Sequence, residues 1–589
     1  MKKKSNFVTV VLTCFREGFR YGGFPLFMTL VFHLVTTSMD AVMPYLNDRL
    51  YNAVGEVIGG ASWTHALWPL LVMGLDLMVV KFLYEYSWFN KSKVNFRLKD
   101  GMLIPVNKAC ATLEPIAFED PAELDRIGKA VSGATGACDF INCVSFIFFY
   151  TLPYILIQTL YFWSLRPVLA LSALIIFIPS VLTQVLRLVM FRKLEDTVAP
   201  MRRENDYFDR TVSHREFFKE TRLLGAYRYF AKRFRESLNN FCRASARAEV
   251  KSGLYHLGSQ AIMLTGYVFV LILLFESVME GYISVGSFAA VLGALANYVF
   301  MIWSFVEDDI GGAVKEYGAV QNYVDFIRGA GEKKPAQKIE NRGDITLSDV
   351  RFTYPGAEHE TIKGITFHIH AGETLAVVGE NGAGKSTLMQ LVTGQFPVTS
   401  GQILAGGVDL SSVNQASRYA GVSAVFQKFG RYRLTAGENI TISADPMGEQ
   451  ALAVAAEKGD VALNDTHTFP DGADTMLSRE FGGVDLSGGQ WQRVAVARGL
   501  YRDHDLVILD EPTAAIDPLE ETRLYKRFAE IAEGKTAIIV THRLGSARIA
   551  DRILVMRDGV IDDVGTHEEL IEKGGYYAEM YAKQAEWYQ

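Results

Sequence analysis

Three features of the 589-residue sequence predict a two-part fold, an α-helical transmembrane domain fused to an α/β P-loop domain. Long apolar stretches fill the chain before about residue 307, whereas an ordinary soluble composition begins at about residue 341. A glycine-rich loop at 379–386 joins a strand-like run to a helix-like run, which is the context that a phosphate-binding loop requires. The length also favours more than one domain, since domains usually have about 100–200 residues.

The N-terminal half contains the candidate membrane segments. The first stretch, 1–20, has a basic start and a short apolar run that Arg16 and Arg20 interrupt, so we expect an amphipathic segment and not a signal peptide. A transmembrane domain is expected at 21–325. Crossing about 30 Å of hydrocarbon takes about 20 helical residues. Apolar windows of about this length predict six spans, at 22–46, 64–88, 138–163, 167–191, 254–279 and 283–306.

The connections between these spans predict their orientation. The loops after the second and fourth spans are long and rich in Lys and Arg, which places them and the N-terminus in the cytoplasm. At about fifty residues they far exceed ordinary helix connections of about 2–8 residues, so we expect helical extensions of the spans. The formal net charge of -7 gives no support to a nucleic-acid partner. The five cysteines form no Cys-x-x-Cys pair, and neither a zinc site nor a disulfide framework is predicted.

A polar linker at 326–340 leads to a soluble domain at 341–589 with a predicted phosphate site. Backbone N–H groups of the glycine-rich loop, together with the helix that follows, are expected to bind nucleotide phosphates. Lys385 would neutralise phosphate charge and Ser386 would ligate Mg²⁺. The candidate ATP-binding residues of this loop are Gly379, Glu380, Asn381, Gly382, Ala383, Gly384, Lys385, Ser386 and Thr387.

A second strand-like run, Leu506–Leu509, ends in two acidic residues. Ligands gather at the carboxyl ends of strands in parallel α/β sheets, so both acids are expected at the phosphate site. Asp510 would hold the Mg²⁺ shell, and Glu511 would polarise the attacking water as general base. The alternative, that the acids only cap the turn before Pro512, leaves the neighbouring motifs unexplained.

The glycine-rich loop, the run Leu486–Gln490 and the strand ending in Asp510 and Glu511 resemble, in this order and spacing, the ATP-binding cassette (ABC) family. The resemblance extends over essentially the whole chain. The chain is similar to a half-molecule of the six-span exporter type (type IV fold). It implies that Tyr354 stacks on adenine, that Gln427 touches Mg²⁺ and the catalytic water, and that His542 senses the γ-phosphate. It also implies that ATP lies between two cassettes. The residues that would contact the ATP of the opposite subunit are Ser487, Gly488, Gly489, Gln490 and Asp517.

The resemblance further implies ATP-driven export of a peptide, drug-like or lipid-like amphiphile by cassette dimerisation and alternating access, in a bacterial inner membrane with the cassette in the cytoplasm. Runs such as Phe426–Phe429 and Glu480–Trp491 are similar to lantibiotic-type peptide exporters without a protease domain. Intact Glu511, His542 and Ser487–Gln490 favour a homodimer, with a heterodimer as the alternative. An exporter-fold siderophore importer and a non-transporting regulator are the alternative functions.

The resemblance also places short transverse coupling helices near 118–125 and 219–226. Within the predicted spans, Asp40, Asp76 and Glu276 are acidic residues at membrane depth, where a charge is costly and usually turned inward. Asp40 is a candidate cargo contact that would favour a cation. The alternatives are a position near the outer water interface and pairing with Lys81 or Arg187.

Overall fold

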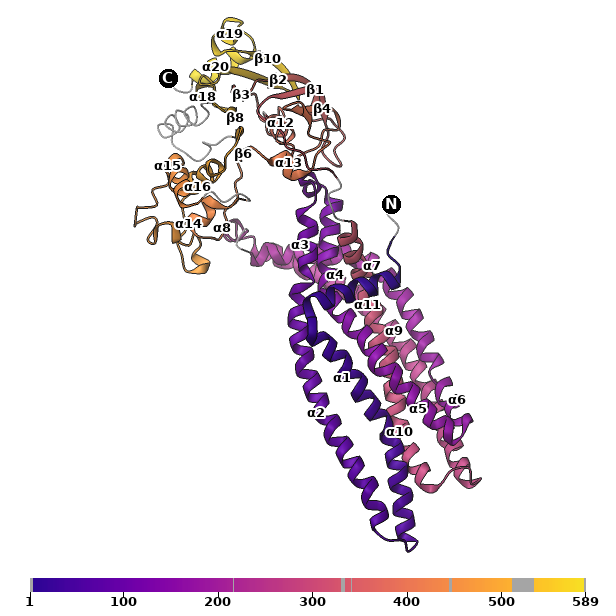
Figure 1. The fold of residues 1–589 in the computed structure, drawn as a ribbon. Coiled ribbons are helices and arrows are strands. Elements are labelled where there is room, and N and C mark those ends of the chain that lie inside the picture. The colour runs from indigo at the N-terminus through magenta and orange to yellow at the C-terminus, as the bar shows by residue number, and fades with distance from the viewer. Residues whose placement is uncertain are drawn as a thin grey trace. The chain divides into compact units, whose positions relative to one another are not determined.

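The computed structural model describes residues 4–214, 217–329, 334–340, 342–443, 448–510 and 534–586. The chain divides into two compact units (Figure 1). The membrane unit comprises Met1–Ala111 and Arg126–Ala330, and the cassette unit comprises Thr112–Asp125 and Gly331–Gln589. A short segment between two membrane-unit helices therefore belongs to the cassette unit.

The described part of the membrane unit consists of helices joined by short turns and contains no described strand. Its elements are α1 (Phe7–Ile58), α2 (Thr64–Gly101), α3 (Leu103–Ala111), α4 (Pro121–Phe146), the π-helical turn η2 (Ile147–Thr151), α5 (Leu152–Leu165), α6 (Pro167–Ile175), α7 (Ile178–Ser213), α8 (Phe218–Leu223), α9 (Tyr227–Met279), α10 (Val285–Ser304), the π-helical turn η3 (Phe305–Ile310) and α11 (Gly311–Gly329). The N-terminal segment is continuous with the first span and bends at Gly23, where φ is 54°, a conformation that glycine adopts without a steric penalty.

Five described helical segments are long and apolar enough to cross a membrane, Phe7–Ile58, Thr64–Ala111, Pro121–Leu165, Tyr227–Met279 and Val285–Gly329. They contain four of the six predicted spans in full, and Val285–Gly329 covers all but the first two residues of the span predicted at 283–306. The predicted fourth span, 167–191, is instead divided between α6 and α7, with the break just before Pro179. Proline at the start of α7 cannot donate the hydrogen bond that would continue α6, which accounts for the interruption.

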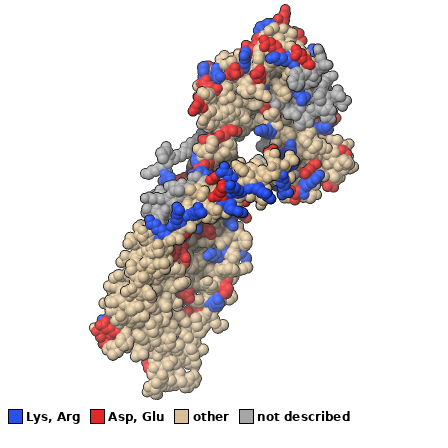
Figure 2. All heavy atoms as spheres, turned by 180° about the vertical axis from the view of Figure 1, so that it is seen from behind, with Lys and Arg blue, Asp and Glu red and all other residues tan. Residues whose placement is uncertain are grey.

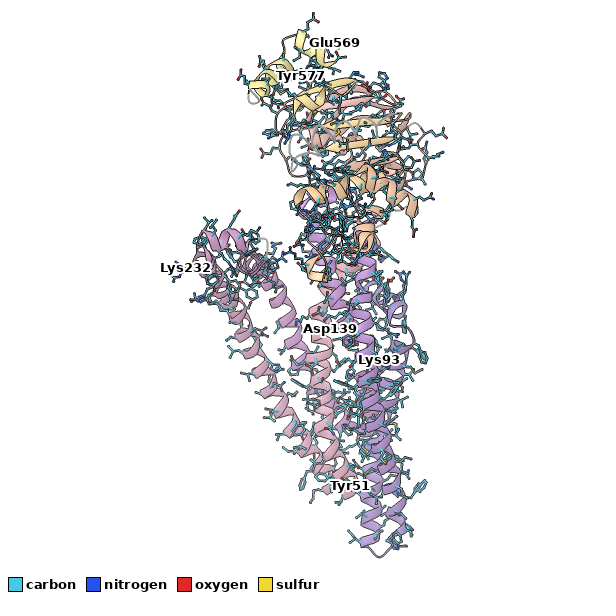
Figure 3. All side chains as sticks on the ribbon, turned by 90° about the vertical axis from the view of Figure 1, so that its left-hand side faces the viewer. Tyr51, Lys93, Asp139, Lys232, Glu569 and Tyr577 are labelled. Carbon is cyan, nitrogen blue, oxygen red and sulfur yellow. The ribbon has the colours of Figure 1, made fainter. Side chains whose placement is uncertain are left out.

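Exposed apolar side chains on the membrane unit fit a lipid environment. Phe82 of α2 is 69% exposed and Trp68 is 72% exposed. Contact between water and an extended apolar surface of such side chains is unfavourable. On the face drawn in Figure 2, described charged residues are sparse over much of this unit, and Lys and Arg gather toward one end. Figure 3 shows α7 and α9 running out together to the turn region marked by Lys232. The long loops are thus helical extensions, as predicted.

The predicted coupling segment 118–125 covers the end of a 3-10 turn, η1 (Pro115–Glu119), and the first residues of the long helix α4. The second predicted segment, 219–226, overlaps the short helix α8. The segment Thr112–Asp125 is held by the cassette unit. Arg418, whose side chain is only 2% exposed, donates from Nη2 to both carboxylate oxygens of Glu114 at 2.7 and 2.6 Å. Gln415 Nε2 donates to the Leu113 carbonyl at 2.7 Å.

The cassette unit contains two sheets. The smaller has the order β2-β1-β4-β5 and is antiparallel, built from β1 (Ile345–Phe352), β2 (Ile362–Ile369), β4 (Ser400–Ala405) and β5 (Val408–Asp409). The larger has the order β10-β9-β3-β8-β7-β6, built from β3 (Thr374–Val378), β6 (Val422–Val425), β7 (Leu506–Asp510), β8 (Thr536–Val540), β9 (Arg552–Arg557) and β10 (Val560–Gly565). Its strands are parallel except β10.

The larger sheet follows from the sequence pattern. Strands β7 and β8 are buried along their whole length, which explains their uninterrupted apolar runs, since strands covered on both faces do not alternate. The described helices of this unit are α12 (Lys385–Val392), α13 (Gln415–Tyr419), α14 (Ala436–Thr441), α15 (Glu449–Lys458), α16 (Gly488–Tyr501), α18 (Leu544–Ala547), α19 (His567–Glu572) and α20 (Tyr576–Glu586). The predicted fold class, a helical membrane domain fused to an α/β domain, is confirmed.

Candidate nucleotide site

The glycine-rich loop lies between β3 and α12. Its backbone requires glycine at two positions that approach other chain segments. A Cβ on Gly379, where φ is 152°, would lie 2.2 Å from the Met556 carbonyl oxygen. A Cβ on Gly384, where φ is 96°, would lie 2.9 Å from Ile362 Cδ1. The loop can therefore turn tightly into α12, whose N-terminal N–H groups and dipole favour an anion.

The side chain of Lys385 forms hydrogen bonds with the backbone of the glycine-rich loop. Its Nζ donates to the carbonyl oxygens of Gly379 at 2.8 Å and Glu380 at 3.0 Å. The side chain is buried, at 6% exposure. These bonds hold the ammonium group of Lys385 against the glycine-rich loop.

The first residues of α12 reach the end of β7. Ser386 Oγ donates to Asp510 Oδ1 at 3.3 Å, so the hydroxyl and the carboxylate predicted to bind Mg²⁺ are adjacent. The described residues hold no group of three or more His, Cys, Asp and Glu side chains that would form a protein-only metal site. One carboxylate beside one hydroxyl instead fits Mg²⁺, which takes few protein ligands and completes its shell with substrate phosphates and water.

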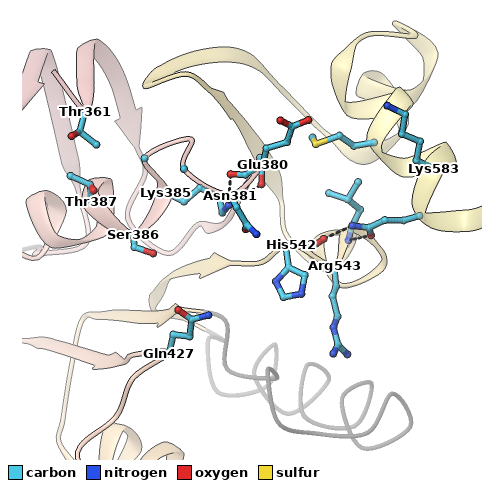
Figure 4. A pocket seen from close by; sticks show the side chains of 16 residues that line it. Thr361, Glu380, Asn381, Lys385, Ser386, Thr387, Gln427, His542, Arg543 and Lys583 are labelled. Atoms are coloured by element: carbon cyan, nitrogen blue, oxygen red, sulfur yellow. Dashed lines mark hydrogen bonds between the residues drawn. The ribbon is translucent and has the colours of Figure 1, made fainter. Parts of the chain in front are cut away.

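A cavity of about 860 Å³ opens over the loop (Figure 4). Its lining brings together most of the glycine-rich loop with Gln427, which follows β6, and His542, which follows β8. These residues come from separate parts of the chain and meet because β3, β8, β7 and β6 are consecutive in the sheet. The remaining lining residues are Thr361, Arg543, Leu544, Met580, Lys583 and Gln584.

Two predicted site residues, Glu511 and Asp517, lie outside the described residues. Tyr354 is not among the described residues that line the cavity. Its ring packs against Phe352 and Phe396, and its hydroxyl pairs with Thr387 Oγ1 at 3.0 Å. Tyr354 thus contacts the start of α12 through its hydroxyl.

The run Ser487–Gln490 also lies outside the lining of the cavity, as far as the chain is described. Ser487 is the N-cap of α16 and forms a capping box with Gln490, with backbone N–H to side-chain distances of 2.8 and 3.3 Å. This arrangement fixes the start of α16, at which N–H groups are exposed for an anion.

Sequence reasoning missed the contribution of α20. Met580, Lys583 and Gln584 of this helix line the cavity, and Gln584 bonds to the backbone next to His542. The helix follows the glycine-rich loop by about two hundred residues and carries no motif. Only the tertiary structure brings it to the site.

The family model for the ABC transporter matches residues 362–514. The subtilin transport ATP-binding protein SpaT of Bacillus subtilis is 27% identical, over 94% of this chain and 91% of its own length. The nisin transport ATP-binding protein NisT of Lactococcus lactis subsp. lactis is 25% identical, over 94% of this chain and 93% of its own length. The ATP-dependent lipid A-core flippase of Escherichia coli (strain K12) is 34% identical, but over only 45% of this chain and 46% of the flippase.

A solved structure shares the fold across both units. The structure of a bacterial Atm1-family ABC exporter with ATP bound superposes with a TM-score of 0.78 and covers 95% of this chain and 98% of that chain, at 22% identity. The matched cassette contains the phosphate loop, Gln427 and Asp510, and the described membrane helices supply the spans. The chain is therefore an ABC exporter half-transporter, an integral membrane ATPase whose helical transmembrane domain is fused to its ATP-binding domain.

Proposed function

We propose that this half-transporter exports a cationic amphiphilic peptide. The observation that carries the proposal is that SpaT and NisT, named for the transport of subtilin and nisin, match 94% of the chain and hence both units. Cargo must meet the membrane domain, so a relative that matches this domain bears on cargo. The lipid A-core flippase is more identical, but the alignment covers less than half of the chain.

Carboxylates in the membrane unit support a cationic cargo. Asp40 accepts a hydrogen bond from the Tyr150 hydroxyl at 2.8 Å, and Asp309 accepts one from Thr151 at 2.9 Å. Asp309 is buried, at 7% exposure. Asp40 lies within the predicted first span, and charges at membrane depth are costly and usually mark a pathway or a binding site.

The described contacts of Asp40 favour this role over the alternative pairing. Lys81 forms an ion pair with Glu85, at 3.0 Å, and the side chain of Arg187 lies outside the described residues. The hydrogen bond from Tyr150 brings no opposite charge to Asp40, since tyrosine is a neutral donor.

ATP would bind in the cavity over the glycine-rich loop. Lys385 would neutralise phosphate charge, and Ser386, Asp510 and Gln427 would surround Mg²⁺. Glu511 would take a proton from the attacking water while His542 holds the γ-phosphate. The adjacency of Ser386 and Asp510 supports the metal assignment.

We infer that the working unit is a homodimer. The chain holds one copy of each motif, and the run Ser487–Gln490 lies away from the cavity that its own cassette forms. A second copy would bring this run and Asp517 to the ATP. ATP would then close the dimer because it contacts both cassettes only in the closed state. The chain supplies both a glutamate at 511 and an intact Ser487–Gln490 run, which supports two active sites.

The predicted orientation places the cassette in the cytoplasm of a bacterial cell. Basic side chains are concentrated in the helical extensions between the second and third, and the fourth and fifth, predicted spans. Such an excess of Lys and Arg favours the cytoplasmic side.

Transport by the chain alone tests the cargo. The purified protein is reconstituted into liposomes, and ATP-dependent uptake is measured with an amphiphilic peptide carrying several lysines and with the same peptide after lysine acetylation. We expect accumulation of the cationic peptide in vesicles with outward-facing cassettes, and a large reduction for the acetylated one. Equal uptake of both, or cargo-stimulated hydrolysis without flux, would contradict the proposal and favour a different cargo or a regulator.

A further inference from the structure

The C-terminal helix α20 is fixed on the cassette core. Tyr577 is 1% exposed, and its hydroxyl pairs with His567 Nδ1 at 2.8 Å. Tyr577 belongs to a buried cluster with Leu544, Ala547 and Val555, against which Met580 and Tyr581 also pack. The side of α20 that faces this cluster is therefore held in place, and Gln584 lies about one turn after Met580 and Tyr581 on the same helix.

That residue, Gln584, bonds to the segment that contains His542. Its Nε2 donates to the His542 carbonyl oxygen, and its Oε1 accepts from the Leu544 N–H at 2.9 Å (Figure 4). The side-chain amide of Gln584 thus forms hydrogen bonds with a backbone carbonyl at 542 and a backbone N–H at 544. A glutamine amide is suited to this because it offers both groups in one plane.

The segment 541–544 has a second anchor on its other side. It begins directly after β8, where the Thr541 N–H donates to the Val377 carbonyl at 3.2 Å. Thr541 Oγ1 then accepts from the Arg543 N–H at 3.0 Å. Beyond β8 the backbone hydrogen bonds of the sheet no longer fix the chain. Hydrogen bonds from the side chains of Thr541 and Gln584 hold the backbone of 542–544 instead.

Tyr576, at the start of α20, connects the same helix to the glycine-rich loop. Burial, together with a hydrogen bond to Glu380, raises the pKa of Tyr576 to about 12. The hydroxyl therefore stays protonated at neutral pH and can keep donating to the Glu380 carboxylate. Helix α20 contacts both the phosphate loop and the His542 segment.

We propose that Gln584 is a positioning residue for His542, which holds the imidazole at the γ-phosphate through its two bonds to the backbone of 542–544. The inference rests on the proposed function in one respect, that His542 acts on the bound nucleotide. A displacement of about 1 Å at a reacting group can lower a rate by about 100-fold. Loss of the amide is therefore expected to lower turnover with little change in ATP affinity.

The test compares three variants of the full-length protein in liposomes. Gln584→Met keeps the length and the apolar stem but removes both bonds. Gln584→Glu keeps the acceptor for the Leu544 N–H and removes the donor to His542. Glu586→Gln is the matched control, because this exposed residue lies two positions further along the same helix.

For Gln584→Met we expect kcat for ATP hydrolysis to fall about 10- to 100-fold while KM for ATP changes less than about threefold. Gln584→Glu should give an intermediate kcat, and it replaces Gln584→Met as the test variant if the latter fails to fold. Glu586→Gln should match the wild type. Unchanged kcat in both Gln584 variants, or a rise in KM that accounts for the whole loss, would overturn the proposal.

A double-mutant cycle with His542→Ala separates positioning from a general structural role. If Gln584 acts through His542, Gln584→Met should add no more than about twofold to the residual single-turnover rate of His542→Ala. Multiplication of the two effects would refute the proposal. If His542→Ala itself hydrolyses ATP normally, the proposed function of His542 is wrong. If only His542→Ala is impaired, the inference about Gln584 alone fails.

Discussion

Replacement of Glu114 by glutamine should release the segment 112–125 from the cassette unit. Glu114 accepts two charge-assisted hydrogen bonds from Arg418 at 2.6 and 2.7 Å, and the arginine side chain is 2% exposed. Removing one partner of a buried ion pair costs about 3–5 kcal/mol, because the other charge remains without its counterion. Glu114 itself is 31% exposed and Lys334 lies at 3.6 Å, so we expect the lower end of this range.

The assay is hydrogen exchange of the full-length protein in lipid nanodiscs, read on peptides that cover 112–125. A loss of about 3 kcal/mol in local opening free energy corresponds to about 100-fold faster exchange, at 1.4 kcal/mol per factor of ten. Exchange in β7 and β8, which are buried throughout, should stay unchanged. Glu119→Gln is the matched control, since Glu119 is exposed in the same segment.

Unchanged protection in Glu114→Gln would show that the ion pair does not hold the segment. In that case the Gln415 bond to the Leu113 carbonyl and the packing of Ile116 against the cassette core would suffice. Equal effects of Glu114→Gln and Glu119→Gln would also refute the reasoning, because only Glu114 pairs with the buried arginine.

Gly379→Ala should abolish binding of a fluorescent ATP analogue, because its Cβ would lie 2.2 Å from the Met556 carbonyl oxygen; Gly128→Ala, in α4, where no atom lies within 4 Å of the new Cβ, should bind normally. Burial lowers the pKa of His504, opposed by its bond to the Arg502 carbonyl, with smaller effects from Lys535, Asp503 and Lys458. Its contribution to stability is therefore complete above about pH 6.5, the usual histidine value, and is lost as the pH falls toward the lowered pKa. Thermal unfolding should shift less between pH 7.5 and 5.5 in His504→Gln. Asp40→Asn should reduce transport of a cationic peptide at least about tenfold without changing basal ATP hydrolysis; equal transport would exclude Asp40 from cargo binding.

Local signals were enough to predict the elements that carry the nucleotide site. The apolar run at 506–509 is β7, and the glycine-rich loop lies between β3 and α12, because both patterns depend on neighbouring residues. The break of the predicted fourth span before Pro179 was missed, although proline was the available signal. Hydropathy averaged over about twenty residues conceals a single helix interruption.

Contacts between distant segments could not be predicted. Glu114 and Arg418 are 304 residues apart in sequence, and Gln584 and His542 are 42 apart. Neither pair has a spacing or motif that indicates contact, since side-chain bonds of this kind depend on the packed fold. The roles assigned to Glu511 and Asp517 stay predictions, because both lie outside the described residues.

Hydrolysis by the chain alone, measured beside Glu511→Gln, is the most direct test of ATP-driven transport by a homodimer. The purified protein is reconstituted into liposomes, and phosphate release is measured together with retention of bound ATP. We predict robust hydrolysis by the wild type, loss of hydrolysis in Glu511→Gln, and stable ATP occlusion in a dimer of that variant. Unimpaired turnover in Glu511→Gln would contradict the assignment of Glu511 as the general base. No ATP hydrolysis by correctly folded wild-type protein, with cationic peptide present, would contradict the homodimer.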